Sequence, residues 1–211
     1  MRESERPFHM NRFILASSSP RRIQLLREAK FHPEVVRPEV AELSCDFLTP
    51  GELARFNARL KAAAVAALNP DATVLGADTI VALGSEVFGK PRDFDEAGRM
   101  LRKLVGKTHE VITGVALIKA NLGRIILRAV CSTVTFHSLS TTEINEYLKT
   151  VDPLDKAGGY AAQNSADVII ERIDGSFTNV VGLPMELIRP LLRSLGVYPS
   201  PESEPCLPVD A

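Results

Sequence analysis

The sequence predicts an α/β fold with a mixed, partly antiparallel sheet flanked by helices. Short apolar runs rich in β-branched residues are separated by segments that have helical periodicity and clear start signals. Strands and helices do not alternate strictly, which favours a mixed sheet over an all-parallel one. Two long β-branched runs, at 109–120 and 124–139, flank Asn121-Leu122-Gly123 and predict an antiparallel hairpin.

The other elements follow from capping and breaking residues. Pro20 suits the first turn of a helix, with Ser18 or Ser19 before it as N-cap. Thr49-Pro50-Gly51-Glu52 and Ser140-Thr141-Thr142-Glu143 have the pattern of capping boxes, so a helix should begin at each. We expect strands at 12–16, 31–36, 73–83 and 167–173, and helices at 21–30, 49–68, 93–105, 140–149 and 184–195.

Length and charge set limits on the organisation and on the partners. A chain of 211 residues with 45% hydrophobic content can bury one sizeable core. We expect a flexible extension at 1–10, one domain at 11–197, and a disordered Pro-rich tail at 198–211. Because 25 basic residues face 26 acidic ones, the net charge predicts no nucleic-acid and no membrane partner, and any phosphate site must be local.

Cysteine usage indicates the compartment. Cys45, Cys131 and Cys206 are far apart and lack zinc-site spacing, so we expect free thiols in a reducing environment. No apolar run approaches the roughly 18 residues that suggest a membrane span, and the first ten residues lack the apolar stretch of a secretory signal. We therefore expect a cytoplasmic protein.

A candidate phosphate site follows the first predicted strand. In Ala16-Ser17-Ser18-Ser19-Pro20-Arg21-Arg22, hydroxyl groups and a helix N-terminus precede two cations. Backbone N–H groups and the helix dipole attract oxyanions, and guanidinium groups bind phosphate oxygens in pairs. The alternative is an ordinary capped helix followed by a solvated pair of arginines.

Asp78 and Thr79 form the second candidate site. They interrupt the apolar strand Thr73–Val81, where an Asp is disfavoured and rarely buried without a partner. A metal ion, or a water molecule that must lose a proton, would explain this carboxylate. The alternative is a strand-end Asp that accepts hydrogen bonds from neighbouring backbone N–H groups.

Single residues elsewhere carry weaker signals. Lys90 on a turn could reach a bound phosphate, and Lys61 is notable because its helical surroundings are apolar, although most lysines are simply solvated. Glu42 has the setting of a surface acid, and His109 that of a structural hydrogen-bonding residue. The amide of Gln163 could read a base edge, or it could stabilise a loop.

Six ordered blocks together resemble the Maf family of nucleotide pyrophosphatases, from about Arg12 to Leu195. They are Ala16-Ser17-Ser18-Ser19-Pro20-Arg21-Arg22, Leu75-Gly76-Ala77-Asp78-Thr79, Gly89-Lys90-Pro91-Arg92-Asp93, Gly106-Lys107-Thr108-His109 with Thr113-Gly114, Asp155-Lys156-Ala157-Gly158-Gly159-Tyr160, and Val180-Val181-Gly182-Leu183-Pro184. The resemblance implies a fold like that of inosine triphosphate pyrophosphatases, with two lobes around a cleft, a divalent metal ion (Mg²⁺ or Mn²⁺) and, frequently, a homodimer.

The resemblance also implies roles for particular residues. Asp78 matches the proton acceptor, and the combination of Arg21, Thr79 and Gln163 matches members that act on dTTP and UTP rather than on 7-methyl-GTP. The expected reaction splits the triphosphate into monophosphate and pyrophosphate.

The expected mechanism places the remaining candidates around the substrate. We expect Glu42 and Asp78 to hold the metal ion, and Ser17 to bind phosphate oxygens together with the helix N-terminus. Arg22, Lys61 and Lys90 would offset the negative charge of the triphosphate.

Two other functions stay open from the sequence. One is a nucleotide-binding regulator of cell division or septum formation with little catalysis. The other is a house-cleaning pyrophosphatase for modified nucleotides, which would share the mechanism and differ in the base pocket.

Overall fold

One mixed sheet runs through the computed structural model, which describes residues 12–163 and 166–200. Its strands are β1 (Phe13–Ala16), β2 (Glu34–Val36), β3 (Thr73–Leu83), β4 (Glu86–Phe88), β5 (Thr108–Lys119), β6 (Arg124–Phe136) and β7 (Ile170–Asp174). The order is β2-β1-β3-β5-β6-β7, and β4 pairs with β3. β1 pairs in parallel with β2 and β3, whereas the remaining pairs are antiparallel, which confirms the predicted mixed sheet.

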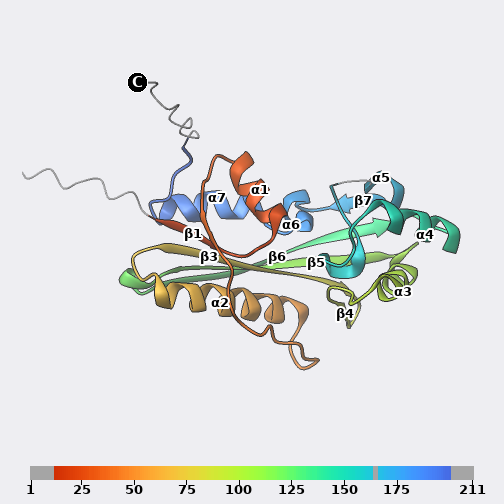
Figure 1. Ribbon diagram of the computed structural model, residues 1–211, viewed down its shortest axis with the longest axis horizontal. Coiled ribbons are helices and arrows are strands. Elements are labelled where there is room, and N and C mark those ends of the chain that lie inside the picture. Colours follow the sequence, from red (N-terminus) through yellow and green to blue (C-terminus); the bar gives the residue numbers. More distant parts are fainter. Residues whose placement is uncertain (1–11, 164–165, 201–211) are drawn as a thin grey trace, which may run out of the picture.

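Helices cover both faces of this sheet (Figure 1). The long helix α2 lies on one face, and α1, α6 and α7 lie on the other; α3 and α4 lie at the far end of the long strands. The bounds are α1 (Pro20–Glu28), α2 (Pro50–Leu68), α3 (Phe94–Leu104), α4 (Thr141–Thr150), α5 (Ala166–Ile169), α6 (Phe177–Val181) and α7 (Met185–Ser194), with the 3₁₀ turns η1 (Ala120–Leu122) and η2 (Ala157–Gly159). Both predicted capping boxes are formed, at the starts of α2 and α4.

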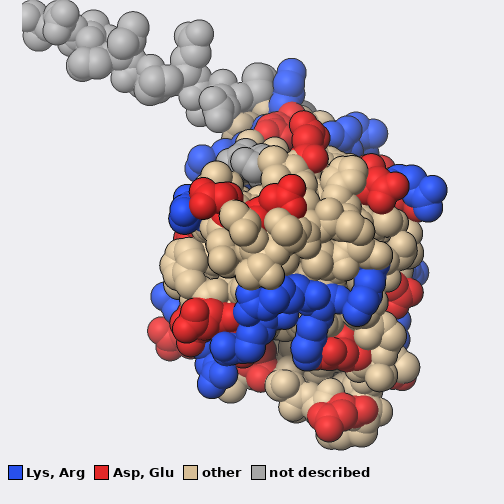
Figure 2. Space-filling view, turned by 90° about the vertical axis from the view of Figure 1, so that its right-hand side faces the viewer, with Lys and Arg blue, Asp and Glu red and all other residues tan. Residues whose placement is uncertain are grey.

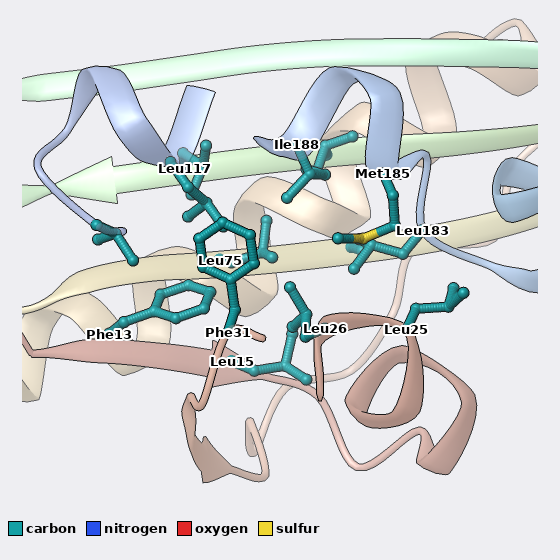
Figure 3. Packing of buried hydrophobic residues seen from close by; sticks show 14 of the residues in the cluster. Phe13, Leu15, Leu25, Leu26, Phe31, Leu75, Leu117, Leu183, Met185 and Ile188 are labelled. Atoms are coloured by element: carbon teal, nitrogen blue, oxygen red, sulfur yellow. The ribbon is translucent and has the colours of Figure 1, made fainter. Parts of the chain in front are cut away.

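Separate apolar clusters stabilise the two ends of the sheet. At one end, side chains of β1, β3 and β5 pack against α1 and α7 (Figure 3), including Leu15, Leu26, Leu75, Leu117 and Ile188. At the other end, a second cluster joins α3 and α4 to the far parts of the same long strands, with Leu101, Phe136, Ile144 and Tyr147 among its buried members. The long strands are therefore common to two halves, which agrees with the expected two lobes on one sheet.

Two glycines allow α2 to lie unusually close to the sheet. A Cβ atom on Gly76 of β3 would lie 2.4 Å from the carbonyl oxygen of Ala58, and one on Gly114 of β5 would lie 2.3 Å from that of Ala54. Because no side chain fits at either position, the backbones of α2 and of the two strands meet directly. This close approach fixes how near the side chains on this face of α2 lie to the strands.

Several predicted elements need correction. The strand predicted at 31–36 begins only at Glu34, because Phe31 turns into the core and packs edge-on against Phe13. The strand predicted at 167–173 is the short helix α5 followed by β7, since pairing with β6 extends only from Ile170 onward. β4 and α6 were not predicted. The hairpin is confirmed, with Thr108 opposite Thr135 and Lys119 opposite Arg124.

The ends of the chain leave part of the predicted organisation untested. The extension at 1–10 and the residues of the tail beyond 200 lie outside the described residues, as does Cys206. At the end of the described chain, Ser200 donates its N–H to the Lys30 carbonyl, so the chain stays attached to the domain as far as Ser200. Cys45 and Cys131 are free thiols. Among the described helices, none combines the length and the apolar character that a membrane crossing needs.

A band of basic side chains crosses the end of the molecule where α3 lies (Figure 2). The exposed cations of α3 are Arg99, Arg102 and Lys103. Arg102 and Lys103 occupy the last turn, where positive charge interacts favourably with the helix dipole. Acidic side chains lie around the band, in keeping with the nearly neutral net charge.

Candidate active site

A gap in strand pairing along one edge of β3 marks the candidate site. β1 pairs with β3 as far as Gly76, and β4 pairs with the same strand from Val81 onward. In the described part of the chain, no strand pairs with residues 77–80 between them on this edge. A cavity of about 960 Å³ lies there, and Asp78 and Thr79 line it.

The cavity brings together every site residue predicted from the sequence. Its lining includes Ser17, Arg21, Arg22, Glu42, Lys61, Asp78, Thr79, Lys90 and Gln163. These residues come from the loop before α1, α1 itself, the segment between β2 and α2, α2, β3, the turn after β4 and the segment after η2. Proximity is a result of the fold; the chemical role of each residue remains a prediction.

The ammonium group of Lys61 joins two carboxylates at the centre of the site. Its Nζ lies 2.7 Å from Oδ1 of Asp78 and 2.8 Å from Oε1 of Glu42. The side chains of Lys61 and Asp78 are each only 9% exposed, whereas Glu42 is 52% exposed. Because Asp78 follows Gly76 by two residues on β3, its side chain faces α2, from which Lys61 extends. Two buried charges thus neutralise each other, and the carboxylate that sequence reasoning found unusual has a partner.

Nearby cations also affect Glu42. Partial burial acts to raise the pKa of Glu42, but the hydrogen bond and charge of Lys61, together with the charges of Lys90 and Arg22, outweigh it. The net result is a pKa below the usual value for a glutamate. Glu42 is therefore a carboxylate at neutral pH and can act as an acceptor or as a metal ligand.

Arg22 connects the loop before α1 to β3 and to the end of α6. Its Nη1 donates to the Ala77 carbonyl at 2.8 Å and to the Ser17 hydroxyl at 3.2 Å. Its Nε donates to the Gly182 carbonyl at 2.9 Å, and its Nη2 to the Thr79 hydroxyl at 3.0 Å. Four of its five N–H groups thus donate to protein acceptors. Arg22 occupies the place of the strand that β3 lacks at Ala77.

Burial has a marked effect on Arg22. Loss of solvent lowers the pKa of its guanidinium group, with a further contribution from the positive charge of Arg21, while Asp78 and Glu42 oppose the shift. An arginine nevertheless stays charged under ordinary conditions. Its positive charge therefore acts on the cavity although most of its donors bind protein groups.

Arg21 makes a different contact, across the cavity to the loop at η2. Its Nη1 lies 2.8 Å from Oδ2 of Asp155, and its Nη2 donates to the Asp155 carbonyl at 3.0 Å. Lys156 bonds the other carboxylate oxygen of Asp155. Burial acts to raise the pKa of Asp155, but these two cations outweigh it and hold the pKa below the usual value. The pair connects α1 to the opposite wall of the cavity.

The N-terminus of α1 leaves backbone donors beside the cavity. Ser19 occupies the N-cap position, as predicted, but its side chain makes no capping hydrogen bond. The Ser17 hydroxyl accepts from the Ser19 N–H at 3.2 Å instead. Residues Ser17 to Arg21 all line the cavity, so the first turn of α1 can bind an anion there.

Comparisons with known proteins bear on the family of this chain. A family model described as Maf-like protein matches residues 12–195. The chain belongs to the Maf family. Among its similar relatives, a dTTP/UTP pyrophosphatase of Desulforamulus reducens is 43% identical over 188 residues, covering 89% of this chain and 98% of the relative. A dTTP/UTP pyrophosphatase of Geobacter sulfurreducens is 44% identical over 185 residues (88% and 97%), and one of Bacillus pumilus 41% over 190 residues (90% and 100%).

Sequence reasoning about this Maf-family chain missed several residues that shape the site. Asp155 and Lys156 were quoted within a motif without a role, although adjacent opposite charges before a Gly-Gly turn could have signalled an ion pair. Tyr160 lines the cavity and bonds buried His109 at 2.9 Å, which gives His109 the structural role expected of it. Asn57 lines the cavity as well, and no sequence signal distinguished it.

Proposed function

We propose that this chain hydrolyses dTTP and UTP to the corresponding monophosphate and pyrophosphate. The observation that carries the proposal is the position of Asp78, a carboxylate held by Lys61 at the unpaired edge of β3 inside a large cavity with many cations. Similarity to relatives named as dTTP/UTP pyrophosphatases, over almost their whole length, supports the reaction and the base.

The charge of the substrate explains the composition of the cavity. A nucleoside triphosphate carries close to four negative charges, so a nucleophilic water can approach only where cations offset them. Lys90 is exposed at the rim, and the first turn of α1 adds backbone donors. Ser17 lies beside that turn, and the buried guanidinium group of Arg22 adds positive charge to the cavity lining. These groups would hold the phosphate chain and stabilise the leaving pyrophosphate.

Asp78 is the proposed general base that activates water. Its Oδ1 accepts a hydrogen bond from Lys61, so Oδ2 is the oxygen left to take a proton. In the proposed step, Asp78 takes a proton from a water molecule whose oxygen attacks the α-phosphorus. The bond between the α-phosphorus and the oxygen that bridges to the β-phosphorus breaks, and pyrophosphate leaves with that oxygen. Lys61 keeps the carboxylate oriented while this happens.

The two carboxylates at Lys61 also fit a divalent cation. Mg²⁺ prefers oxygen ligands and is commonly held by one or two carboxylates, with water and substrate phosphates completing its shell. Glu42 and Asp78 supply such a pair, whereas the described residues contain no group of three or more His, Cys, Asp and Glu side chains arranged for a metal. When bound, Mg²⁺ or Mn²⁺ would neutralise phosphate charge and polarise the phosphorus centre.

Three residues would select the base. Thr79 faces away from α2, where its hydroxyl contacts Arg22 and Thr113. Arg21 lies nearby, held by Asp155, and Gln163 is exposed on the cavity wall, where its amide offers both a donor and an acceptor. An amide can pair with the carbonyl and N–H groups that uracil and thymine share.

The setting of the enzyme belongs to the same proposal. The free thiols of Cys45 and Cys131 and the nearly neutral charge support a cytoplasmic enzyme of small nucleotides that binds neither nucleic acid nor membranes. The expected homodimer rests on the resemblance to the family.

A panel of nucleoside triphosphates tests the proposal. With Mg²⁺, monophosphate and pyrophosphate should form in equal amounts, and faster from UTP and dTTP than from ATP, GTP or 7-methyl-GTP. Asp78→Asn should lower kcat by about 10²- to 10⁴-fold, the usual effect of losing a general base. Asp71→Asn, on an exposed turn outside the cavity, is the matched control and should keep wild-type rates.

Two results would contradict the proposal. If Asp78→Asn released pyrophosphate as fast as the wild-type protein, Asp78 would not be the base. If the wild-type protein bound nucleotides without turnover, the chain would be a nucleotide-binding regulator instead.

A further inference from the structure

The segment that carries Glu42 has no regular secondary structure. Between β2, which ends at Val36, and α2, which begins at Pro50, the described chain forms neither helix nor strand. Its apolar side chains Leu43 and Leu48 pack against a cluster formed by the start of α2 and by β3 and β5. Apolar packing alone does not fix the backbone of a loop to within the reach of one hydrogen bond, so Glu42 needs a further restraint to meet Lys61.

Asn57 supplies a paired hydrogen bond to that backbone. Its Oδ1 accepts from the Leu43 N–H at 2.8 Å, and its Nδ2 donates to the Leu43 carbonyl at 3.0 Å. The amide therefore binds both main-chain groups of the residue that directly follows Glu42. Asn57 is only 3% exposed, so little solvent competes for these two hydrogen bonds.

The position of Asn57 on α2 connects it to the reactive centre. It precedes Lys61 by four residues, so both side chains lie on the same face of the helix, one turn apart. The helix that carries the ammonium group thus also sets the position of the loop that carries Glu42. The close approach of α2 at Gly76 and Gly114 places this whole face against Asp78.

We propose that Asn57 is a positioning residue that holds Glu42 at Lys61 and Asp78 by gripping the backbone of Leu43. The inference rests on the proposed function for the role of Glu42, but the grip itself does not. In Asn57→Leu, a side chain of similar size loses both hydrogen bonds. The Leu43 groups can then bind water from the cavity, and Glu42 is no longer held in place.

A double-mutant cycle tests whether Asn57 acts through Glu42. Asn57→Leu should lower kcat/KM for UTP about tenfold, the effect expected from losing one to two hydrogen bonds. In a Glu42→Gln background the same change should have almost no effect, because residues that act as a unit are not additive. Equal losses in both backgrounds, or no loss in the first, would overturn the proposal.

Amide hydrogen exchange gives a readout that does not depend on activity. The Leu43 amide should exchange at least tenfold faster in Asn57→Leu than in the wild-type protein, while the amides of Ala58 and Ala62 keep their protection. Unchanged exchange at Leu43 would overturn the grip even if activity fell. A wild-type protein without pyrophosphatase activity, but with the expected exchange, would sink the proposed function and leave the grip standing.

Asn69→Ala is the matched control. Asn69 lies just beyond the C-terminal end of the same helix, where its amide donates to the Val65 carbonyl, and it does not line the cavity. It should therefore leave kcat/KM and Leu43 exchange at wild-type values. A loss of kcat/KM equal to that of Asn57→Leu would show that general loosening of α2 is the cause, and this would overturn the proposal.

Discussion

At the scale of single residues, the cavity depends on side chains whose partners come from distant parts of the chain. Lys61 is bound by Glu42 and Asp78. Arg22 is bound by two groups of β3, by the Ser17 hydroxyl and by the Gly182 carbonyl. Buried charges are tolerated only where such partners exist. The two cations differ in what they offer: Lys61 holds carboxylates, whereas Arg22 completes an incomplete strand edge.

Arg22→Lys tests whether the shape or the charge of Arg22 matters. A lysine keeps the charge but cannot reach the Ala77, Gly182, Ser17 and Thr79 acceptors together. We expect the free energy of unfolding to fall by about 3 kcal/mol, because buried acceptors lose their donors. Chemical denaturation measures this, with exposed Arg27→Lys as the control that should change it by less than about 0.5 kcal/mol. Equal effects of the two variants would contradict the role given to Arg22.

His109 predicts how stability depends on pH. Burial lowers the pKa of His109 from its ordinary 6.5 to about 4. Above pH 6.5 the ring is neutral in both states; between pH 6.5 and 4 the unfolded chain binds a proton that the folded protein does not. The contribution of His109 to the free energy of unfolding is therefore complete above pH 6.5. It is lost as the pH falls toward 4, by up to about 1.4 kcal/mol per pH unit.

Denaturation at a series of pH values checks this prediction. His109→Gln removes the titrating ring while keeping a group that can bond Tyr160, so its unfolding free energy should fall less steeply over the same interval. Parallel curves for the two proteins would show that another group is responsible.

At the scale of elements, α2 acts as a unit with β3 and β5 because its backbone touches β3 at Gly76 and β5 at Gly114. The alanines of α2 that face the sheet complete this contact. The arrangement brings Asn57 and Lys61 to the depth of Asp78 without a bend in the helix. A larger residue at either glycine would separate α2 from the sheet and move the ammonium group of Lys61 away from the carboxylate of Asp78.

Gly76→Ala is expected to disturb both stability and activity. The added Cβ would lie 2.4 Å from the Ala58 carbonyl oxygen, so the helix must shift, and overpacking of this kind costs about 1–3 kcal/mol. Gly51→Ala offers a control of opposite sign, since it lies on α2 with nothing within 4 Å and should raise stability by about 0.5–1 kcal/mol. Thermal unfolding compares the two variants, and a stable, fully active Gly76→Ala would refute the tight contact.

At the scale of the whole molecule, the cavity lies between two apolar clusters that share the long strands. One wall comes from the loop after β1 and from α1, and the other from β4 and the loop at η2. The ion pair of Arg21 and Asp155 joins the two walls. A ligand that fills the cavity contacts both halves and should therefore stabilise the entire domain.

A substrate analogue should make this stabilisation visible. A UTP analogue with a methylene group between the α- and β-phosphorus atoms cannot be cleaved there. At about one hundred times its Kd, with Mg²⁺, it should stabilise the protein by about 2.7 kcal/mol. For a domain of this size that corresponds to a rise in Tm of roughly 5–10 °C. The same ATP analogue at equal concentration should raise Tm less, and no rise with either would argue against the cavity as the nucleotide site.

Local sequence patterns were enough to predict the features that depend on neighbours along the chain. The capping boxes at Thr49 and Ser140 start their helices by bonds within one turn, and the β-branched runs on both sides of Gly123 form the hairpin. The family motifs likewise contain the cavity residues Ser17, Arg21, Arg22, Asp78, Thr79 and Lys90, whereas Glu42, Lys61 and Gln163 lie outside those blocks. Each of these signals is contained in a few consecutive residues.

Which of those side chains meet depends instead on the packing of the folded chain. Three sets of contacts join segments that are far apart in the sequence, and no local pattern predicts such contacts. They are the ion pair of Asp78 with Lys61, the hydrogen bonds of Arg22 to Ala77 and Gly182, and the hydrogen bonds of Asn57 to Leu43. The start of β7 at Ile170 was also decided this way, since a strand begins where its neighbour offers backbone groups. Long-range pairing depends on how helices and strands pack in space, and local patterns along the chain do not encode that packing.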